Sequence, residues 1–162
     1  KDWATTGTEG RRAPQVINSL FLKPEELEEH NRRLAEKHRH IEERETRWES
    51  YRCDDAELVF VSYGTSARVV RNAIELLRES GLRAGLIRPI TLWPFPFGAF
   101  EQLGESVKAL MSVEMSMGQM VDDVKIAAAG RRPVGFYGRS GGMVPDQHGV
   151  VEAAETFMKE VV

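Results

Sequence analysis

The sequence predicts an α/β fold in which a mostly parallel sheet is covered by helices on both faces. From residue 56 onward, four short apolar runs alternate with four stretches of helical period. The runs are apolar at successive positions, which is typical of strands buried on both faces. Connections of this length permit right-handed crossovers between parallel strands. We therefore expect four parallel strands with helices between them, preceded by a long charged helix.

The first 55 residues differ in composition from the rest of the chain. Residues 1–22 are rich in Gly, Thr, Arg and Pro without a sustained period, so we expect an extended leader that needs a partner surface to become ordered. Residues 23–55 are densely charged and predict a helical arm, with Pro24 in its first turn. The apolar residues of the arm recur every seven positions in one narrow stripe: Leu27, Leu34, Ile41 and Trp48. Such a stripe indicates a helix that lies either on its own domain or on another subunit.

The α/β domain is expected to occupy residues 56–162. We predict strands at 57–63, 82–90, 109–115 and 133–139, and helices at 64–81, 97–104, 116–130 and 146–161. Helical spacing places three apolar sets against the sheet: Val69, Val70, Ala73, Ile74 and Leu77; Met117, Met120, Val121, Val124 and Ala128; and Val150, Ala154, Phe157, Met158 and Val161.

Charge and cysteine content exclude several classes of protein. The net charge is -3 with acids and bases interspersed, which disfavours a nucleic-acid or membrane partner. Cys53 is the single cysteine, which excludes a disulfide framework and a thiolate cage for a metal or cluster within this chain. We expect a cytoplasmic protein. Because the chain begins at Lys1 rather than Met, we also expect a piece of something longer.

Polar residues follow each predicted strand, at the edge where ligands of such sheets bind. Thr65, Ser66, Arg88 and Arg139 lie at these strand ends. Hydroxyls, guanidinium groups and the N–H groups of a helix start bind phosphates and carboxylates, so one hypothesis is an anion site. The alternative is structural, with Thr65 or Ser66 capping the helix that follows.

Glu114 ends a buried strand, and Gln119 lies nearby on the same rim. A desolvated carboxylate at this position would transfer protons, whereas an ionised one would cap the next helix, and we favour the cap. His148 follows a turn without an evident acid or nucleophile partner, so no catalytic triad is predicted. We predict no catalytic residue and no metal ligand in this chain.

Two loops at this rim are candidate joints with a partner protein. The loop TLWPFPFGAF carries aromatic residues between prolines, which either anchor a partner or fold back over the sheet. The loop GRSGG supplies glycines that suit a shaped turn or a joint between subunits. The candidate interface residues are Trp93, Phe95 and Phe97 in the first loop and Gly138, Arg139, Gly141 and Gly142 in the second.

The order of these sequences resembles a known family. The blocks LVFVSYGTSARVVRNAIELLRESG, LRAGLIRPITLWPFPFGAF, SVEMSMGQMVDDV and GFYGRSGGMVP resemble the C-terminal region of the alpha subunit of 2-oxoacid:ferredoxin oxidoreductases, especially the 2-oxoisovalerate and 2-oxoglutarate members. The arm, which ends in ERETRWESYRCDDAE, resembles the segment that precedes this domain in the 2-oxoisovalerate type.

The resemblance implies a three-layer α/β/α sandwich of the transketolase C-terminal type. Its sheet would be mostly parallel, with four to five strands and usually one antiparallel strand. We expect the fifth strand to come from about Pro14 to Leu20, or to be replaced by the arm.

The resemblance also implies an enzyme that oxidatively decarboxylates a 2-oxoacid on thiamine diphosphate and Mg, reduces ferredoxin through iron–sulfur clusters and passes the acyl group to coenzyme A. Its partners would be beta, gamma and ferredoxin-like subunits, in a homo- and hetero-oligomer, together with ferredoxin. With one cysteine and no Gly-Asp-Gly sequence, this chain is expected to hold none of these cofactors.

We therefore expect an assembly domain that fixes the geometry of the enzyme and is inactive alone. Two alternatives remain open. One is a module that binds an anion, such as a phosphate of coenzyme A, at the strand ends. The other is the equivalent domain of another thiamine diphosphate enzyme.

Overall fold

A computed structural model describes residues 7–14 and 16–161 of the chain, so part of the expected leader over 1–22 lies outside the described residues. The structure divides between His40 and Ile41 into two compact units. Helix α1 (Pro24–Glu45) crosses this division, with Glu25 and Glu26 in its first turn and Arg44 in its last, as the helix dipole favours. No residue of α1 is buried by the described part of the chain.

The predicted arm is too long, because its last part is a strand. The helix ends at Glu45, and Trp48–Tyr51 form strand β1. Strand β1 pairs antiparallel with β3 (Ala84–Pro89), from Trp48 opposite Pro89 to Tyr51 opposite Leu86. The antiparallel strand that the family resemblance implied is therefore confirmed. It comes from the arm, and the described residues between 14 and 20 form no strand.

The other four strands are parallel, as predicted. They are β2 (Leu58–Val61), β3, β4 (Ala109–Glu114) and β5 (Val134–Gly138), and the order across the sheet is β1-β3-β2-β4-β5. Strand β2 lies at the centre between β3 and β4, and all four of its residues are buried. Strand β5 is an edge strand with half-exposed positions, including Phe136 at 40% exposure. It therefore departs from the prediction that every strand is apolar and covered on both faces.

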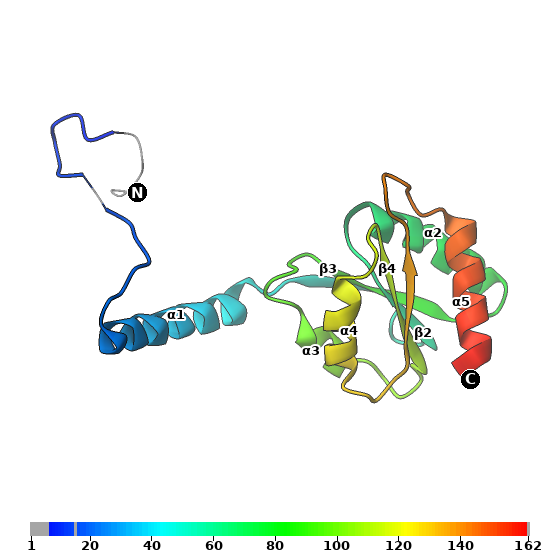
Figure 1. Cartoon of the computed structure of the whole chain (residues 1–162). Helices are drawn as coiled ribbons and strands as arrows, with labels where there is room; N and C mark the ends of the chain where they lie inside the picture. Colours follow the sequence, from blue (N-terminus) through cyan, green and yellow to red (C-terminus); the bar gives the residue numbers. More distant parts are fainter. Residues whose placement is uncertain (1–6, 15, 162) are drawn as a thin grey trace. The chain divides into compact units, whose positions relative to one another are not determined.

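Helices cover both faces of the sheet, which confirms the sandwich (Figure 1). On one face, α2 (Gly64–Glu79) and α5 (Gln147–Val161) enclose a core with Phe60, Leu86 and Met111. On the other, α3 (Phe97–Glu101) and α4 (Met120–Ala128) enclose Val59, Val61 and Ile87. The residues predicted to face the sheet from α2, α4 and α5 are buried or half-buried, except Met117. Met117 is 82% exposed because α4 begins three residues later, at Met120.

The segment between β1 and β2 is held against the sheet by Arg78 of α2. The Arg78 guanidinium donates to the carbonyl oxygens of Ala84 (2.7 Å) and Arg52 (2.9 Å) and to the Asp55 carboxylate (2.6 Å). This segment passes so close to β3 that a Cβ on Gly85 would lie 2.6 Å from the Arg52 carbonyl oxygen. Position 85 therefore requires glycine, because the segment that contains Arg52 leaves no room for a side chain.

No helix in the described ranges has the length and apolar content to cross a membrane.

Candidate functional site

The carboxyl ends of β2, β3, β4 and β5 lie at one edge of the sheet, and the candidate residues gather there. At the end of β4, the Glu114 side chain accepts five hydrogen bonds. Its Oε2 accepts from the backbone N–H groups of Gln119 and Met120, both at 3.0 Å, and from the Ser116 hydroxyl at 2.9 Å. Its Oε1 accepts from the N–H of Val121 and the Ser112 hydroxyl, both at 2.8 Å.

Glu114 is only 1% exposed, yet the arrangement favours its ionised form. Burial raises the pKa of the carboxyl group. The hydrogen bonds from Ser112, Gln119, Ser116 and Met120 outweigh burial and hold the pKa of Glu114 below its ordinary value. An ionised carboxylate at the N-terminus of α4 is the cap that the sequence favours. Gln119 takes part through its backbone N–H group.

The start of α2 has no such cap. Its N-cap residue is Tyr63, which makes no side-chain capping bond, and Gly64 has a φ of +57°. Thr65 is exposed and Ser66 is 4% exposed, and both lie within the first turn of α2 rather than before it. The alternative that Thr65 or Ser66 is the N-cap residue is therefore wrong.

Arg88 lies beside this helix start, together with two arginines that sequence reasoning missed. A hollow of about 140 Å³ is lined by Ala67, Arg68, Arg71 and Arg88. Glu49 of β1 pairs with Arg88 at 3.1 Å and with Arg71 at 3.6 Å. The three-residue spacing of Arg68 and Arg71, which places them on one face of a helix, was the available signal.

Arg139 does not join this group, so the four-residue anion site of the sequence hypothesis is not assembled. Arg139 follows β5, which is separated from β3 by β2 and β4. Three strand spacings of about 4.8 Å place these strands about 14 Å apart. The order of strands, rather than the residues themselves, divides the predicted site.

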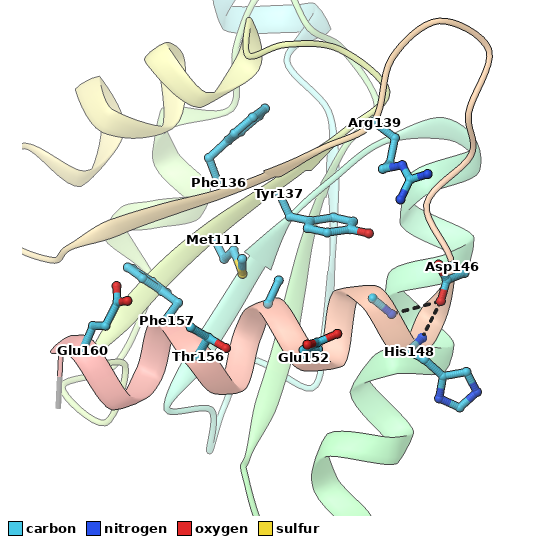
Figure 2. Close-up of a pocket in the computed structure, with 12 residues that line it drawn as sticks. Met111, Phe136, Tyr137, Arg139, Asp146, His148, Glu152, Thr156, Phe157 and Glu160 are labelled. Atoms are coloured by element: carbon cyan, nitrogen blue, oxygen red, sulfur yellow. Dashed lines mark hydrogen bonds between the residues drawn. The ribbon is translucent and has the colours of Figure 1, made fainter.

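Arg139 instead lines a cavity of about 750 Å³ between β5 and α5. Figure 2 shows Arg139, Asp146 and His148 at one end of this cavity, and Phe157 and Glu160 at the other. Asp146 Oδ1 accepts the backbone N–H groups of Gly149 (2.9 Å) and His148 (3.1 Å), which makes Asp146 a cap of α5. These two hydrogen bonds lower the pKa of the Asp146 carboxyl group, and the bond from Gly149 has the larger effect.

The aromatic loop after β3 divides into a buried and an exposed part. Phe95 is 7% exposed and packs on Phe100, with ring centroids 5.7 Å apart. This burial contradicts the expectation that Phe95 contacts a partner, because the ring belongs to the core of its own domain. Trp93 and Phe97 are 56% and 44% exposed. Both alternatives for the loop are thus realised, in different residues.

The exposed part of this loop belongs to a larger apolar set, here called the apolar rim. Every member follows the carboxyl end of β3, β4 or β5, in the loop or, for Phe97, at the first residue of α3, and each is at least 44% exposed. The members are Ile90, Leu92, Trp93, Phe97, Met115, Met117, Met143 and Val144.

The glycines of GRSGG serve two different needs. A Cβ on Gly138 would collide with the Phe136 ring and the Ser116 carbonyl oxygen, so only glycine fits at this position. Gly141 and Gly142 have φ of +63° and +86° and face open space, which makes them turn residues. The turn is closed by the N–H of Met143, which donates to the Ser140 carbonyl oxygen at 3.2 Å.

The described residues do not fit a metal or cluster site. They contain no group of three or more His, Cys, Asp or Glu side chains placed to hold a metal ion. Cys53 is half-buried and donates to the Leu86 carbonyl oxygen at 3.3 Å, and burial raises the pKa of its thiol. A thiol held protonated in this way is a poor ligand for iron.

Comparison with known proteins identifies the domain. Residues 56–150, more than half of the chain, match the family model "Pyruvate:ferredoxin oxidoreductase core domain II". The chain belongs to this family. Core domain II therefore includes β2 to β5 and the start of α5, while β1 and most of α5 lie outside the matched range.

Relatives of core domain II extend the match into the arm. The chain is 44% identical over 150 residues to the ketoisovalerate oxidoreductase subunit VorB of Methanothermobacter thermautotrophicus, which covers 93% of this chain and 42% of the relative. It is 38% identical over 96 residues to the 2-oxoglutarate synthase subunit KorA of Methanothermobacter marburgensis, covering 58% of this chain and 26% of the relative. The chain thus spans about two fifths of the length of the curated relative that it matches over most of its residues.

A solved structure has the same fold. The 2-oxoglutarate:ferredoxin oxidoreductase from Magnetococcus marinus, solved with 2-oxoglutarate, coenzyme A and succinyl-CoA bound, aligns with a TM-score of 0.71 at 20% identity. The alignment covers 94% of this chain and 28% of that chain. The family model and the relatives confirm the resemblance to 2-oxoacid:ferredoxin oxidoreductases, and the solved structure supports the fold. The family match sets aside the equivalent domain of another thiamine diphosphate enzyme.

Proposed function

We propose that this chain is the C-terminal assembly domain of an alpha-type subunit in a cytoplasmic 2-oxoacid:ferredoxin oxidoreductase. The complete enzyme would oxidatively decarboxylate a 2-oxoacid to an acyl-coenzyme A and reduce ferredoxin. Thiamine diphosphate, Mg and the iron–sulfur clusters would lie in other domains and subunits. In this proposal the chain contributes surface and rigidity to the assembly.

The observation that carries the proposal is the apolar rim. Monomeric proteins seldom expose large contiguous apolar patches, and such patches mark protein contacts. The members of the apolar rim all follow strands that end at the same edge of the sheet. Trp and Met, both present in the rim, are enriched where partner proteins meet. The leader adds Val16, Ile17, Leu20 and Leu22, each more than 70% exposed, as a second apolar stretch for a partner surface.

Rigidity at the rim has a structural basis. Glu114 holds the loop between β4 and α4, and Phe95 anchors the loop after β3 in the core. The exposed side chains therefore project from loops that are fixed at their bases. An interface presented in this way loses little conformational entropy on association.

Within the family, the 2-oxoisovalerate type is the better assignment. The ketoisovalerate relative matches 93% of the chain, which requires that the match include much of the arm, whereas the 2-oxoglutarate relative matches 58%. We propose a branched 2-oxoacid as the substrate of the complete enzyme. The partners would be beta, gamma and ferredoxin-like subunits together with ferredoxin.

The assembly proposal is tested in the complete subunit, purified with its partner subunits. Trp93→Ser and Met117→Ser should each weaken subunit association, and an anchor residue of the usual strength, about 2 kcal/mol, corresponds to roughly a 30-fold rise in Kd. Ile126→Ser is the matched control, because Ile126 is 65% exposed near the far end of α4, away from the rim. Association measured by native mass spectrometry and ultracentrifugation that is equal in all three variants would contradict the proposal.

A further inference from the structure

We propose that Arg68, Arg71 and Arg88 form a binding site for a phosphate group beside the start of α2. This inference goes beyond the assembly function and does not depend on it. Arg68 and Arg71 lie three residues apart on α2, so both side chains leave the same face of the helix. Arg88 reaches the same hollow from the end of β3, which neighbours β2 on one side and β1 on the other.

The charges in this hollow are unbalanced. Three arginines line it, and among the described residues Glu49 is the carboxylate that pairs with them, at 3.1 Å from Arg88 and 3.6 Å from Arg71. A dianionic phosphate would neutralise the remaining two positive charges. Glu49 lies on an edge strand with a 45% exposed side chain, so it can make room for a ligand while it stays paired with one of the arginines.

The Arg88 side chain has an unused donor. Its Nε atom is buried and has no hydrogen-bond partner among the described residues. Buried donors are rarely left unsatisfied in folded proteins, and each exception calls for an explanation. The Nε–H and a terminal N–H of one guanidinium form a fork that matches two oxygens of a phosphate. Because the Arg88 Nε atom has no exposed surface in this structure, the side chain would turn to present this fork to a ligand.

Two further features orient the hollow toward an anion. Arg71 lies over the Tyr51 ring, with its Cζ 4.8 Å from the ring centroid, which limits the positions open to its guanidinium. Ala67, which lines the hollow, belongs to the first turn of α2, where Tyr63 provides no side-chain cap. The positive end of the helix dipole therefore adds to the field of the three arginines.

The size of the hollow limits what can enter. Its volume of about 140 Å³ corresponds to about five water molecules at ~30 Å³ each. One phosphate group fits, whereas a whole nucleotide does not. The ligand is therefore inorganic phosphate or a terminal phosphate that projects from a larger molecule.

The test is a titration of the ¹⁵N-labelled chain at constant ionic strength, with inorganic phosphate, coenzyme A and dephospho-coenzyme A as separate probes. We expect saturable amide shifts at Thr65 to Arg71 with at least one phosphate probe. Arg68→Ala should raise Kd at least fivefold, and Arg88→Lys, which retains the charge but removes the fork, should also raise it. Arg131→Ala is the control, because Arg131 is exposed in the turn between α4 and β5.

The probes separate the sources of the phosphate. Tighter binding of coenzyme A than of its dephospho form assigns the site to the 3′-phosphate that the cofactor carries. Binding of inorganic phosphate that is at least as tight as that of both coenzymes assigns the site to free phosphate. The proposal is overturned if shifts grow linearly without saturation, or if Arg68→Ala, Arg88→Lys and Arg131→Ala all bind like the unaltered chain. None of these results bears on subunit association, so the two proposals fail independently.

Discussion

Replacement of Glu114 by Gln would remove the negative charge from the start of α4 while keeping the shape of the side chain. The amide has one acceptor oxygen in place of two. If its nitrogen takes the position of Oε1, the Ser112 hydroxyl can reverse and accept, but the Val121 N–H loses its acceptor. If the nitrogen takes the position of Oε2, the N–H groups of Gln119 and Met120 are both left without one. The first arrangement is therefore the less unfavourable.

The magnitude follows from that arrangement. One buried N–H group without a partner costs about 1–3 kcal/mol, and loss of a charge at a partly buried helix N-terminus costs about 1–2 kcal/mol. We therefore expect Glu114→Gln to lower the free energy of unfolding by about 2–5 kcal/mol, a large part of the ~5–15 kcal/mol available to a typical domain. Glu79→Gln, on the exposed face of α2, should change it by less than about 0.5 kcal/mol.

The assay is urea unfolding followed by circular dichroism between pH 3 and pH 8. The pKa of Glu114 is lowered in the folded chain relative to its ordinary value of 4.5, so the unfolded state binds the proton more tightly. The stability that Glu114 contributes is therefore fully present above this value and is lost as the pH falls below it. The difference between the unaltered chain and Glu114→Gln should shrink in acid. A constant difference across this range, or one below about 1 kcal/mol at pH 7, would refute an ionised cap.

Two further predictions concern packing and activity. Gly85→Ala should destabilise the chain by about 1–3 kcal/mol in the same unfolding assay, because its Cβ would lie 2.6 Å from the Arg52 carbonyl oxygen. The control is Gly98→Ala, in α3 with open space around it, which should be neutral or slightly stabilising. Equal effects of the two substitutions would contradict the close approach at Gly85. The purified chain alone should show neither 2-oxoacid decarboxylation nor an iron signal in metal analysis, and turnover above the background of a mock purification would overturn the assignment as an assembly domain.

Most helices and strands of the domain could be predicted from the sequence because residues typical of turns and helix ends mark where they begin and end. Strands β2, β3 and β4 are buried apolar runs, and helices α2, α4 and α5 each show an apolar face and a break close to their ends. Strand β1 was not readable. Its sequence WESY carries a charge, spans only four residues and continues the seven-residue stripe of the helix before it. An edge strand needs one partner, and its pairing with β3 overrides the local helical pattern.

The candidate site was predicted in part. The sequence placed Glu114 at a helix start and Arg88 at a strand end, since both facts follow from local position. It could not separate Arg88 from Arg139, because strand order is a property of the whole sheet. It also passed over Arg68 and Arg71, since arginines on a helix surface are usually solvated, and only the position of β3 beside α2 gives them a common hollow.

Strand β1 has a consequence for where this domain can be cut. The family match begins at residue 56, after β1. A polypeptide trimmed to that boundary would leave the apolar strand AGLIRP with a free row of N–H and C=O groups and would uncover Gly85. Such an edge recruits strands from other molecules, so the trimmed form should precipitate or form fibrils, whereas one that starts at Thr46 retains its own cover.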